Sequence, residues 1–183
     1  MKHILLLLTT VAFMISCSER KSHIDIAKIA VQADSLTIEA QKQLLKNLSQ
    51  AISDSGFVYA IDYCNINASQ ILSSVSDTHQ AVSIERLTDK NRNPSNHIAG
   101  IDDKAIFEQF YNNLKDTITI ADDFVQYYKP IKILMPTCLK CHGASSDIPT
   151  EVLDRINLKY PKDLALGYKE GDLRGMWKVT LRK

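Results

Sequence analysis

The first half of the chain carries a helical pattern of apolar residues. Residues 24–53 contain no Gly or Pro. Apolar side chains recur there near a spacing of three to four residues, at Ile26, Ile29, Leu36, Leu44, Leu48 and Ile52, which is typical of one face of a helix. The polar triplet Asp54-Ser55-Gly56 predicts the end of this helix. A second helix is expected over residues 57–72.

The second half changes to strand-like patterns. Residues 80–88 and 175–181 alternate between apolar and polar positions, and residues 117–128 are rich in β-branched and aromatic residues, so strands are expected there. A helix is expected over residues 103–115, with one apolar face made of Ile106, Phe107, Phe110 and Leu114, and a short one over residues 149–157. Polar residues and Pro94 predict a loop at 90–96, and Gly167 and Gly171 predict a turn.

This order of elements indicates the fold class. Helices precede most of the strands and do not alternate with them, so an α+β fold with a long N-terminal helix is favoured over a βαβ arrangement.

The N-terminus has the features of an export signal. Lys2 and His3 precede an apolar run over residues 4–15, which is too short to cross a bilayer comfortably. The run ends in Ser16-Cys17 and resembles a bacterial lipobox, which implies cleavage before Cys17 and acylation of that residue. We therefore expect a lipoprotein signal peptide at 1–16, a polar tether at 17–23 and one domain at 24–183. The protein would be extracytoplasmic, held by lipid on a bacterial membrane and facing the periplasm or the cell exterior.

Composition excludes one class of partner. The formal net charge of the whole chain is +1, and a balanced charge argues against nucleic-acid binding.

The stretch Cys138-Leu139-Lys140-Cys141-His142 carries the clearest chemistry. Two cysteines separated by two residues and followed by histidine are typical of covalent attachment of a c-type haem, with the histidine as an iron ligand. A zinc site would need a second Cys/His pair at ligand spacing, and a thioredoxin motif would follow a strand and open a helix, whereas Pro136 and Gly143 flank this one. The motif predicts one covalently attached haem, held by Cys138 and Cys141 and ligated by His142.

The sequence alone does not decide which residue is the second axial ligand of the iron. With Cys17 acylated and two cysteines bound to haem, Cys64 is the cysteine that remains. The other candidates are His79, His97, Met135 and Met176, and Met or His is the usual second ligand in c-type haems. A buried, inert thiol is the alternative role for Cys64.

Several motifs together resemble a known family. They are Arg86, Arg92-Asn93-Pro94, Asn96, Tyr128-Lys129-Pro130-Ile131, the CxxCH motif with Gly143, Tyr160-Pro161-Lys162-Asp163, Ala165-Leu166-Gly167-Tyr168 and Gly171-Asp172-Leu173-Arg174-Gly175. This pattern is similar to the single-haem, c-type, PAS-like domain family of extracytoplasmic bacterial proteins. The resemblance implies a PAS-like antiparallel sheet flanked by helices, and an unusual axial pair that would here be His142 and Cys64. The chain departs from the family after Asn96, where it reads His97-Ile98-Ala99-Gly100.

Three arginines lie within these motifs. Arg86, Arg92 and Arg174 are candidates for binding the haem propionates, because a guanidinium group can clamp a carboxylate with two hydrogen bonds. The alternative for each is a solvated surface arginine. Tyr127, Tyr128 and Trp177 could line the ring edge, although aromatic residues more often belong to the core.

These expectations combine into one functional hypothesis. The chain would be a lipid-anchored monohaem cytochrome acting in redox sensing or one-electron transfer outside the cytoplasm, with an unknown redox or signalling protein as partner. The alternative is a haem enzyme of the peroxidase type, which would need an open distal site.

Overall fold

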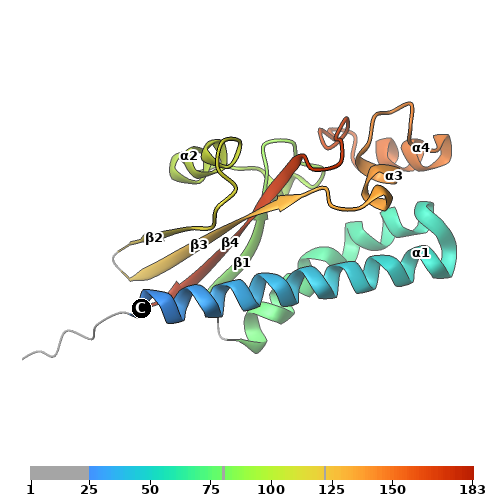
Figure 1. The fold of residues 1–183 in the computed structure, drawn as a ribbon. Helices are drawn as coiled ribbons and strands as arrows, with labels where there is room; N and C mark the ends of the chain where they lie inside the picture. Colours follow the sequence, from blue (N-terminus) through green and yellow to red (C-terminus); the bar gives the residue numbers. More distant parts are fainter. Residues whose placement is uncertain (1–24, 80, 122) are drawn as a thin grey trace, which may run out of the picture.

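A computed structural model describes residues 25–79, 81–121 and 123–183. Its centre is a four-stranded antiparallel sheet in the order β1-β4-β3-β2 (Figure 1). The strands are β1 (Ser83–Leu87), β2 (Thr117–Ile120), β3 (Phe124–Lys132) and β4 (Leu173–Arg182). The expected α+β fold, with a long N-terminal helix and an antiparallel sheet flanked by helices, is confirmed.

The helix α1 (Ile26–Thr78) is bent. It starts at Asp25, whose carboxylate accepts a hydrogen bond from the backbone N–H of Lys28 at 3.0 Å. Ser55 and Gly56 are not helical, and Gly56 has φ of 77°, a conformation that favours glycine. The chain folds back at this point (Figure 1), so the expected break at residues 54–56 is confirmed.

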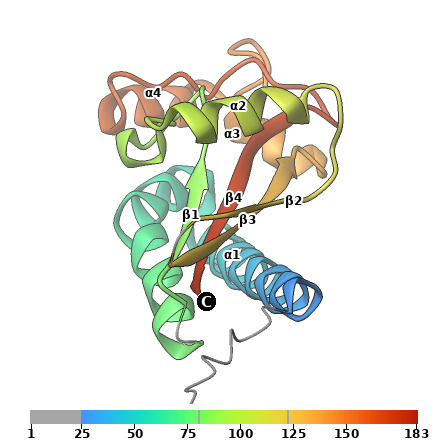
Figure 2. The same cartoon turned by 90° about the vertical axis from the view of Figure 1, so that its left-hand side faces the viewer.

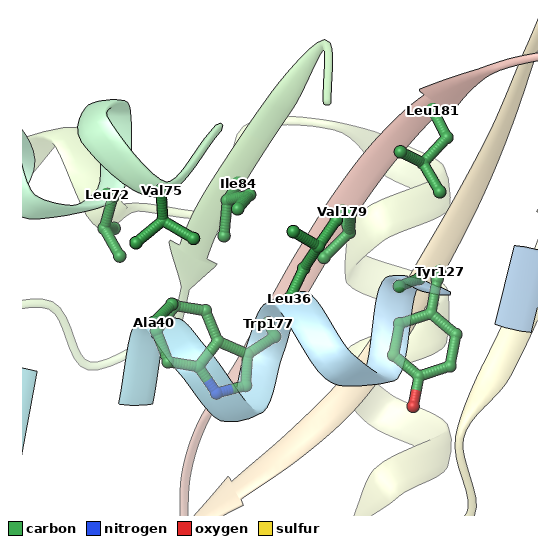
Figure 3. Close-up of a cluster of buried hydrophobic side chains, with 10 residues drawn as sticks. Leu36, Ala40, Leu72, Val75, Ile84, Tyr127, Trp177, Val179 and Leu181 are labelled. Atoms are coloured by element: carbon green, nitrogen blue, oxygen red, sulfur yellow. The ribbon is translucent and has the colours of Figure 1, made fainter. Parts of the chain in front are cut away.

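Each face of the sheet has its own hydrophobic core. Figure 3 shows the core between α1 and the sheet, where Leu36 and Ala40 pack against Trp177 and Val179. On the opposite face lies α2 (Ile101–Phe110), which buries Ile106, Phe107 and Phe110 against Tyr128 and Met176. Neighbouring residues of a strand point to opposite faces, so Tyr127 and Trp177 belong to the core beneath α1 while Tyr128 and Met176 belong to the core beneath α2. Figure 2 shows the two helices on opposite sides of the sheet.

The helices α3 (Leu139–His142) and α4 (Thr150–Lys159) lie at the end of the molecule where α1 bends (Figure 1). Two 3-10 turns complete the described elements, Pro94–Asn96 and Pro136–Cys138. Ile61 of α1 packs against Val152 and Ile156 of α4.

Several expected boundaries were wrong. The second half of α1 continues to Thr78 rather than stopping at residue 72, and β1 is shorter than the predicted 80–88. The helix predicted at 103–115 spans Ile101–Phe110, so Leu114 lies beyond it and is exposed. Residues 117–128 hold one strand and most of another, and β3 runs on to Lys132.

The predicted signal peptide and tether, residues 1–23 with Cys17, lie outside the described residues. Within the part of the chain that the structure describes, no helix is both long enough and apolar enough to cross a membrane.

Candidate functional site

The motif that carries the two cysteines and the histidine forms a tight turn after β3. Pro136 opens a 3-10 turn that ends at Cys138, and α3 follows directly. The N–H of Gly143 closes the turn by donating to the carbonyl of Leu139 at 2.9 Å. A Cβ atom on Gly143 would lie 2.6 Å from that carbonyl oxygen, so this position requires glycine.

A second segment, residues 163–168, holds the turn through backbone hydrogen bonds. The N–H of Gly167 donates to the carbonyl of Gly143 at 2.8 Å, and the N–H of Tyr168 donates to that of His142 at 2.9 Å. These two contacts fix the backbone on which His142 is carried.

His142 has one ring nitrogen occupied and one available. Its Nδ1 lies 2.8 Å from the carbonyl oxygen of Ala165. A carbonyl only accepts, so Nδ1 carries the proton and Nε2 keeps a free lone pair. Burial, and then the charges of Arg92 and Arg174, hold the pKa of His142 well below its usual value. The ring is therefore a neutral imidazole with Nε2 free, the form that binds a metal ion.

The two cysteines of the motif pack against different clusters. Cys138 contacts the group formed by Ile133, Ala165 and Tyr168, while Cys141 packs against the α1–α4 core. Both are half-buried free thiols. Burial raises the pKa of Cys141 to about 11, so it is a neutral thiol at pH 7.

Cys64 lies on the second half of α1 and faces the same region. Its charged form would interact with Arg86, Arg92 and Cys141, which places it beside the motif. Burial raises the pKa of this half-buried thiol, and the two arginines oppose that rise.

The three arginines also come together here, because the charges of Arg86, Arg92 and Arg174 all act on His142. Arg92 is already paired with Asp163 at 2.9 Å. Arg174 donates to neutral oxygens of Thr88 and Lys90 and lies over the ring of Tyr168.

Arg86 and Arg174 have no carboxylate partner among the described residues. The Nε atoms of Arg86 and Arg92 are buried without a hydrogen-bond partner there. Burial, together with the charge of Arg174, lowers the pKa of Arg86. Buried donors and uncompensated cations are costly, so this region fits a ligand that brings carboxylates, as the two propionates of a haem would.

A groove adjoins Arg86. It has a volume of about 300 Å³ and lies between the second half of α1, β1 and the turn Pro94–Asn96. Ser69 and Ser73 line it on one side, and Arg86 and Asn96 on the other.

The other candidate iron ligands lie elsewhere. His79 and His97 are exposed, and Met135 is 41 % exposed. Met176 is fully buried in the α2 cluster. Tyr127, Tyr128 and Trp177 belong to the two sheet cores, so they take the core role and not a place at the ring edge.

Three residues of the site carried no predicted role. Asp163 binds Arg92, the Ala165 carbonyl holds His142, and Tyr168 lies edge-on to the His142 ring with centroids 6.3 Å apart. All three lie within motifs that carried the family resemblance, which was the one signal that pointed to them. The described residues contain no cluster of three or more His, Cys, Asp or Glu side chains able to hold a metal ion.

Comparisons with known proteins agree with this picture. A family model described as Tll0287-like matches residues 18–182. The crystal structure of the cyanobacterial heme-protein Tll0287 superposes with a TM-score of 0.62 at 23% sequence identity, and the match covers 86% of this chain and 94% of that one. At this identity the likeness shows the fold. No protein with curated annotation matches the chain.

Proposed function

Because this chain belongs to the Tll0287-like family, we propose that it is a lipid-anchored monohaem c-type cytochrome for redox sensing or one-electron transfer outside the cytoplasm. The observation that carries the proposal is His142, a neutral imidazole fixed through Nδ1 with Nε2 free, next to two thiols and a group of arginines. The cyanobacterial protein with the matching crystal structure is a heme-protein, which supports the same cofactor here.

Cys138 and Cys141 would attach the haem. Each S–H would add across one vinyl C=C bond, so that a C–S bond forms and the thiol hydrogen passes to the other vinyl carbon. The reaction needs no oxidant. The two half-buried thiols on one short turn are free for it.

His142 and Cys64 would be the axial ligands. The two residues come from different parts of the chain, α3 and the second half of α1. The charge of Cys64 acts on Cys141, which directly precedes His142, and this supports the pairing. Burial raises the pKa of Cys64, and the charges of Arg86 and Arg92 oppose that rise. Binding to iron would use the charged thiolate form. A thiolate donates electron density and favours ferric iron.

Arg86 and Arg174 would bind the propionates, with Arg92 adding its free Nε. Neither Arg86 nor Arg174 is paired with a carboxylate among the described residues, and the Nε atom of Arg86 is buried there without a hydrogen-bond partner. Bound haem supplies a one-electron redox couple, and the protein supplies its ligands, counter-charges and exclusion of water. Two protein ligands would leave no open iron position for a substrate, which would favour a carrier or sensor over a peroxidase.

The anchor and the location rest on the sequence. Acylation of Cys17 would hold the domain to the membrane, and haem attachment of this type takes place outside the cytoplasm. The partner would be a redox or signalling protein.

The test is to remove both attachment thiols. Cys138→Ala with Cys141→Ala is expected to give protein from which acid–acetone extracts all the haem, whereas the wild type and the control Cys64→Ala keep it. A double variant that retains haem through denaturation would contradict covalent attachment. High-spin spectra and peroxide turnover in the wild type would instead favour the peroxidase.

A further inference from the structure

The ion pair between Arg92 and Asp163 is the least exposed one in the described part of the chain. Its side chains are 11% and 3% exposed. A pair this deeply buried is costly to form, and therefore needs a reason. Its surroundings supply one, because both residues contact the backbone that carries or holds His142.

Asp163 and Arg92 act on the backbone groups of Ala165. One carboxylate oxygen of Asp163 accepts from the Ala165 N–H at 2.9 Å, and the other accepts from Arg92. The Ala165 carbonyl accepts from Nδ1 of His142 at 2.8 Å and is 3.5 Å from Nη2 of Arg92. The same Nη2 donates to the carbonyl of Cys141 at 2.6 Å.

This arrangement links a negative charge to the imidazole. The Arg92 guanidinium draws electron density from the Ala165 carbonyl and competes with His142 for it. Asp163 compensates that charge, so the carbonyl remains a strong acceptor for Nδ1–H. Partners of this kind set the basicity and orientation of a metal-bound histidine.

We propose that Asp163 is a positioning residue that, through Arg92 and the Ala165 carbonyl, sets how strongly His142 donates to iron. The inference rests on the proposed haem ligation by His142. It assigns Asp163 to control of the reduction potential, a role distinct from binding the haem.

The test is Asp163→Asn in the haem-loaded, full-length protein. Asparagine keeps an oxygen for the Ala165 N–H but removes the negative charge, which leaves Arg92 uncompensated near His142. Added positive charge and a weaker imidazole both favour ferrous iron. We expect the equilibrium constant for one-electron reduction to rise about ten-fold, equivalent to about 59 mV in a spectroelectrochemical titration.

Two controls separate charge from packing. Asp103 on α2 forms a comparably buried ion pair with Lys178, with side chains 14% and 15% exposed. This helix covers the other face of the sheet from α1. Asp103→Asn removes the carboxylate of that pair and should leave the reduction potential unchanged. Asp163→Glu keeps the charge and should stay close to the wild-type potential. Amide hydrogen exchange at Gly167 and Tyr168 should remain slow in Asp163→Asn, because their acceptors are not altered.

The outcomes distinguish this inference from the proposed function. Wild-type protein without covalent haem overturns the proposed function and this inference with it. An unchanged potential in Asp163→Asn with haem attached overturns the inference alone, as does an equal shift in Asp163→Glu. If Asp163→Asn fails to accumulate, Asp163→Ser, whose hydroxyl can accept from Ala165, should show the same rise.

Discussion

At the scale of single residues, the site is organised around one neutral imidazole. His142 is fixed by a backbone carbonyl and surrounded by the charges of three arginines. Cationic neighbours and burial both oppose its protonation. The His142 ring is thus already in its metal-binding form without a bound cofactor.

Cys64→Ala should open the sixth coordination position. Loss of a thiolate donor should raise the reduction potential, turn the ferric haem high-spin or water-bound, and speed carbon monoxide binding to the ferrous form. Absorption spectra and a redox titration measure these changes. His79→Ala and His97→Ala are the matched controls, since both side chains are exposed, and their spectra should match the wild type. If a histidine or methionine variant changes the spectrum while Cys64→Ala does not, the axial assignment is wrong.

Sequence spacing could predict some of these residues and not others. The CxxCH motif is local, so its five residues can be recognised as a candidate site without knowledge of the fold. The contact between His142 and Ala165 joins positions 23 residues apart through a backbone oxygen, and any residue type could supply that oxygen. The pairing of Arg92 with Asp163, 71 residues apart, also depends on how loops pack.

At the scale of elements, the bend in α1 brings Cys64 to the motif. Without the break at Ser55 and Gly56, the second half of α1 would continue away from α3 and α4. Glycine at this bend has φ of 77° and no neighbouring atoms where a Cβ would stand, so the backbone conformation alone selects it.

Gly56→Ala should destabilise the fold by roughly 1–3 kcal/mol, the cost of holding an L-residue at φ 77° and ψ −177°, a region that essentially only glycine adopts. Urea unfolding measures it. Ser53→Ala is the control, since residue 53 is exposed and helical, and should change stability little. Equal stability of Gly56→Ala and the wild type would show that the bend tolerates a side chain.

A polar clamp holds α4 to α1. Asp62 accepts from Arg155, with Nε to Oδ1 at 2.9 Å, and lies 3.4 Å from Lys159. The hydrogen bond from Arg155 holds the pKa of Asp62 below its usual value of 3.8. Because the pKa of Asp62 is lower in the folded state, its ion pair stabilises the fold at every pH above the unfolded-state pKa. That stabilisation is lost as the pH falls through the lower, folded-state pKa.

Asp62→Asn should therefore lower the thermal midpoint slightly at pH 7 and weaken its dependence on pH below about 4. Thermal unfolding scans from pH 7 to pH 2.5 measure both effects. Asp77→Asn, at an exposed position of the same helix, is the control. If the thermal midpoint of Asp62→Asn falls as steeply with decreasing pH as that of the wild type, this ion pair does not contribute to stability.

Elements were easier to predict than their ends. Polar residues and glycine marked the bend of α1 correctly. The second half of this helix runs on to Thr78 because Leu72, Val75 and Ser76 are buried, which its polar composition concealed. The helix α2 ends at Phe110, so the apparent apolar continuation at Leu114 did not extend it.

At the scale of the whole molecule, the sheet separates two cores. The strand order β1-β4-β3-β2 places the last strand in the centre. The alternation of apolar and polar residues along a strand indicates which face each side chain occupies, and it does not indicate which strands are neighbours. The fold class followed from the order of elements, while the topology needed the structure.

Cys17→Ser should release the protein from membranes into the soluble extracytoplasmic fraction, because acyl chains supply the membrane affinity in the proposed anchor. Fractionation followed by immunodetection measures this. Ser18→Ala, the neighbouring position, is the control and should remain membrane-bound. A Cys17→Ser variant that stays in the membrane fraction would contradict the anchor.

The straight first half of α1 has a consequence for the distance between the proposed anchor and the candidate haem site. It starts at the opposite end of the molecule from α3 and α4 (Figure 1), and a helix from Ile26 to the bend is about 40 Å long at 1.5 Å per residue. With the proposed tether at its start, this segment would be a rigid spacer. It would separate the candidate haem site from the proposed lipid anchor by roughly the thickness of a lipid bilayer. A redox partner of the proposed cytochrome would then be expected to contact the end of the domain that carries α3 and α4, opposite the start of α1.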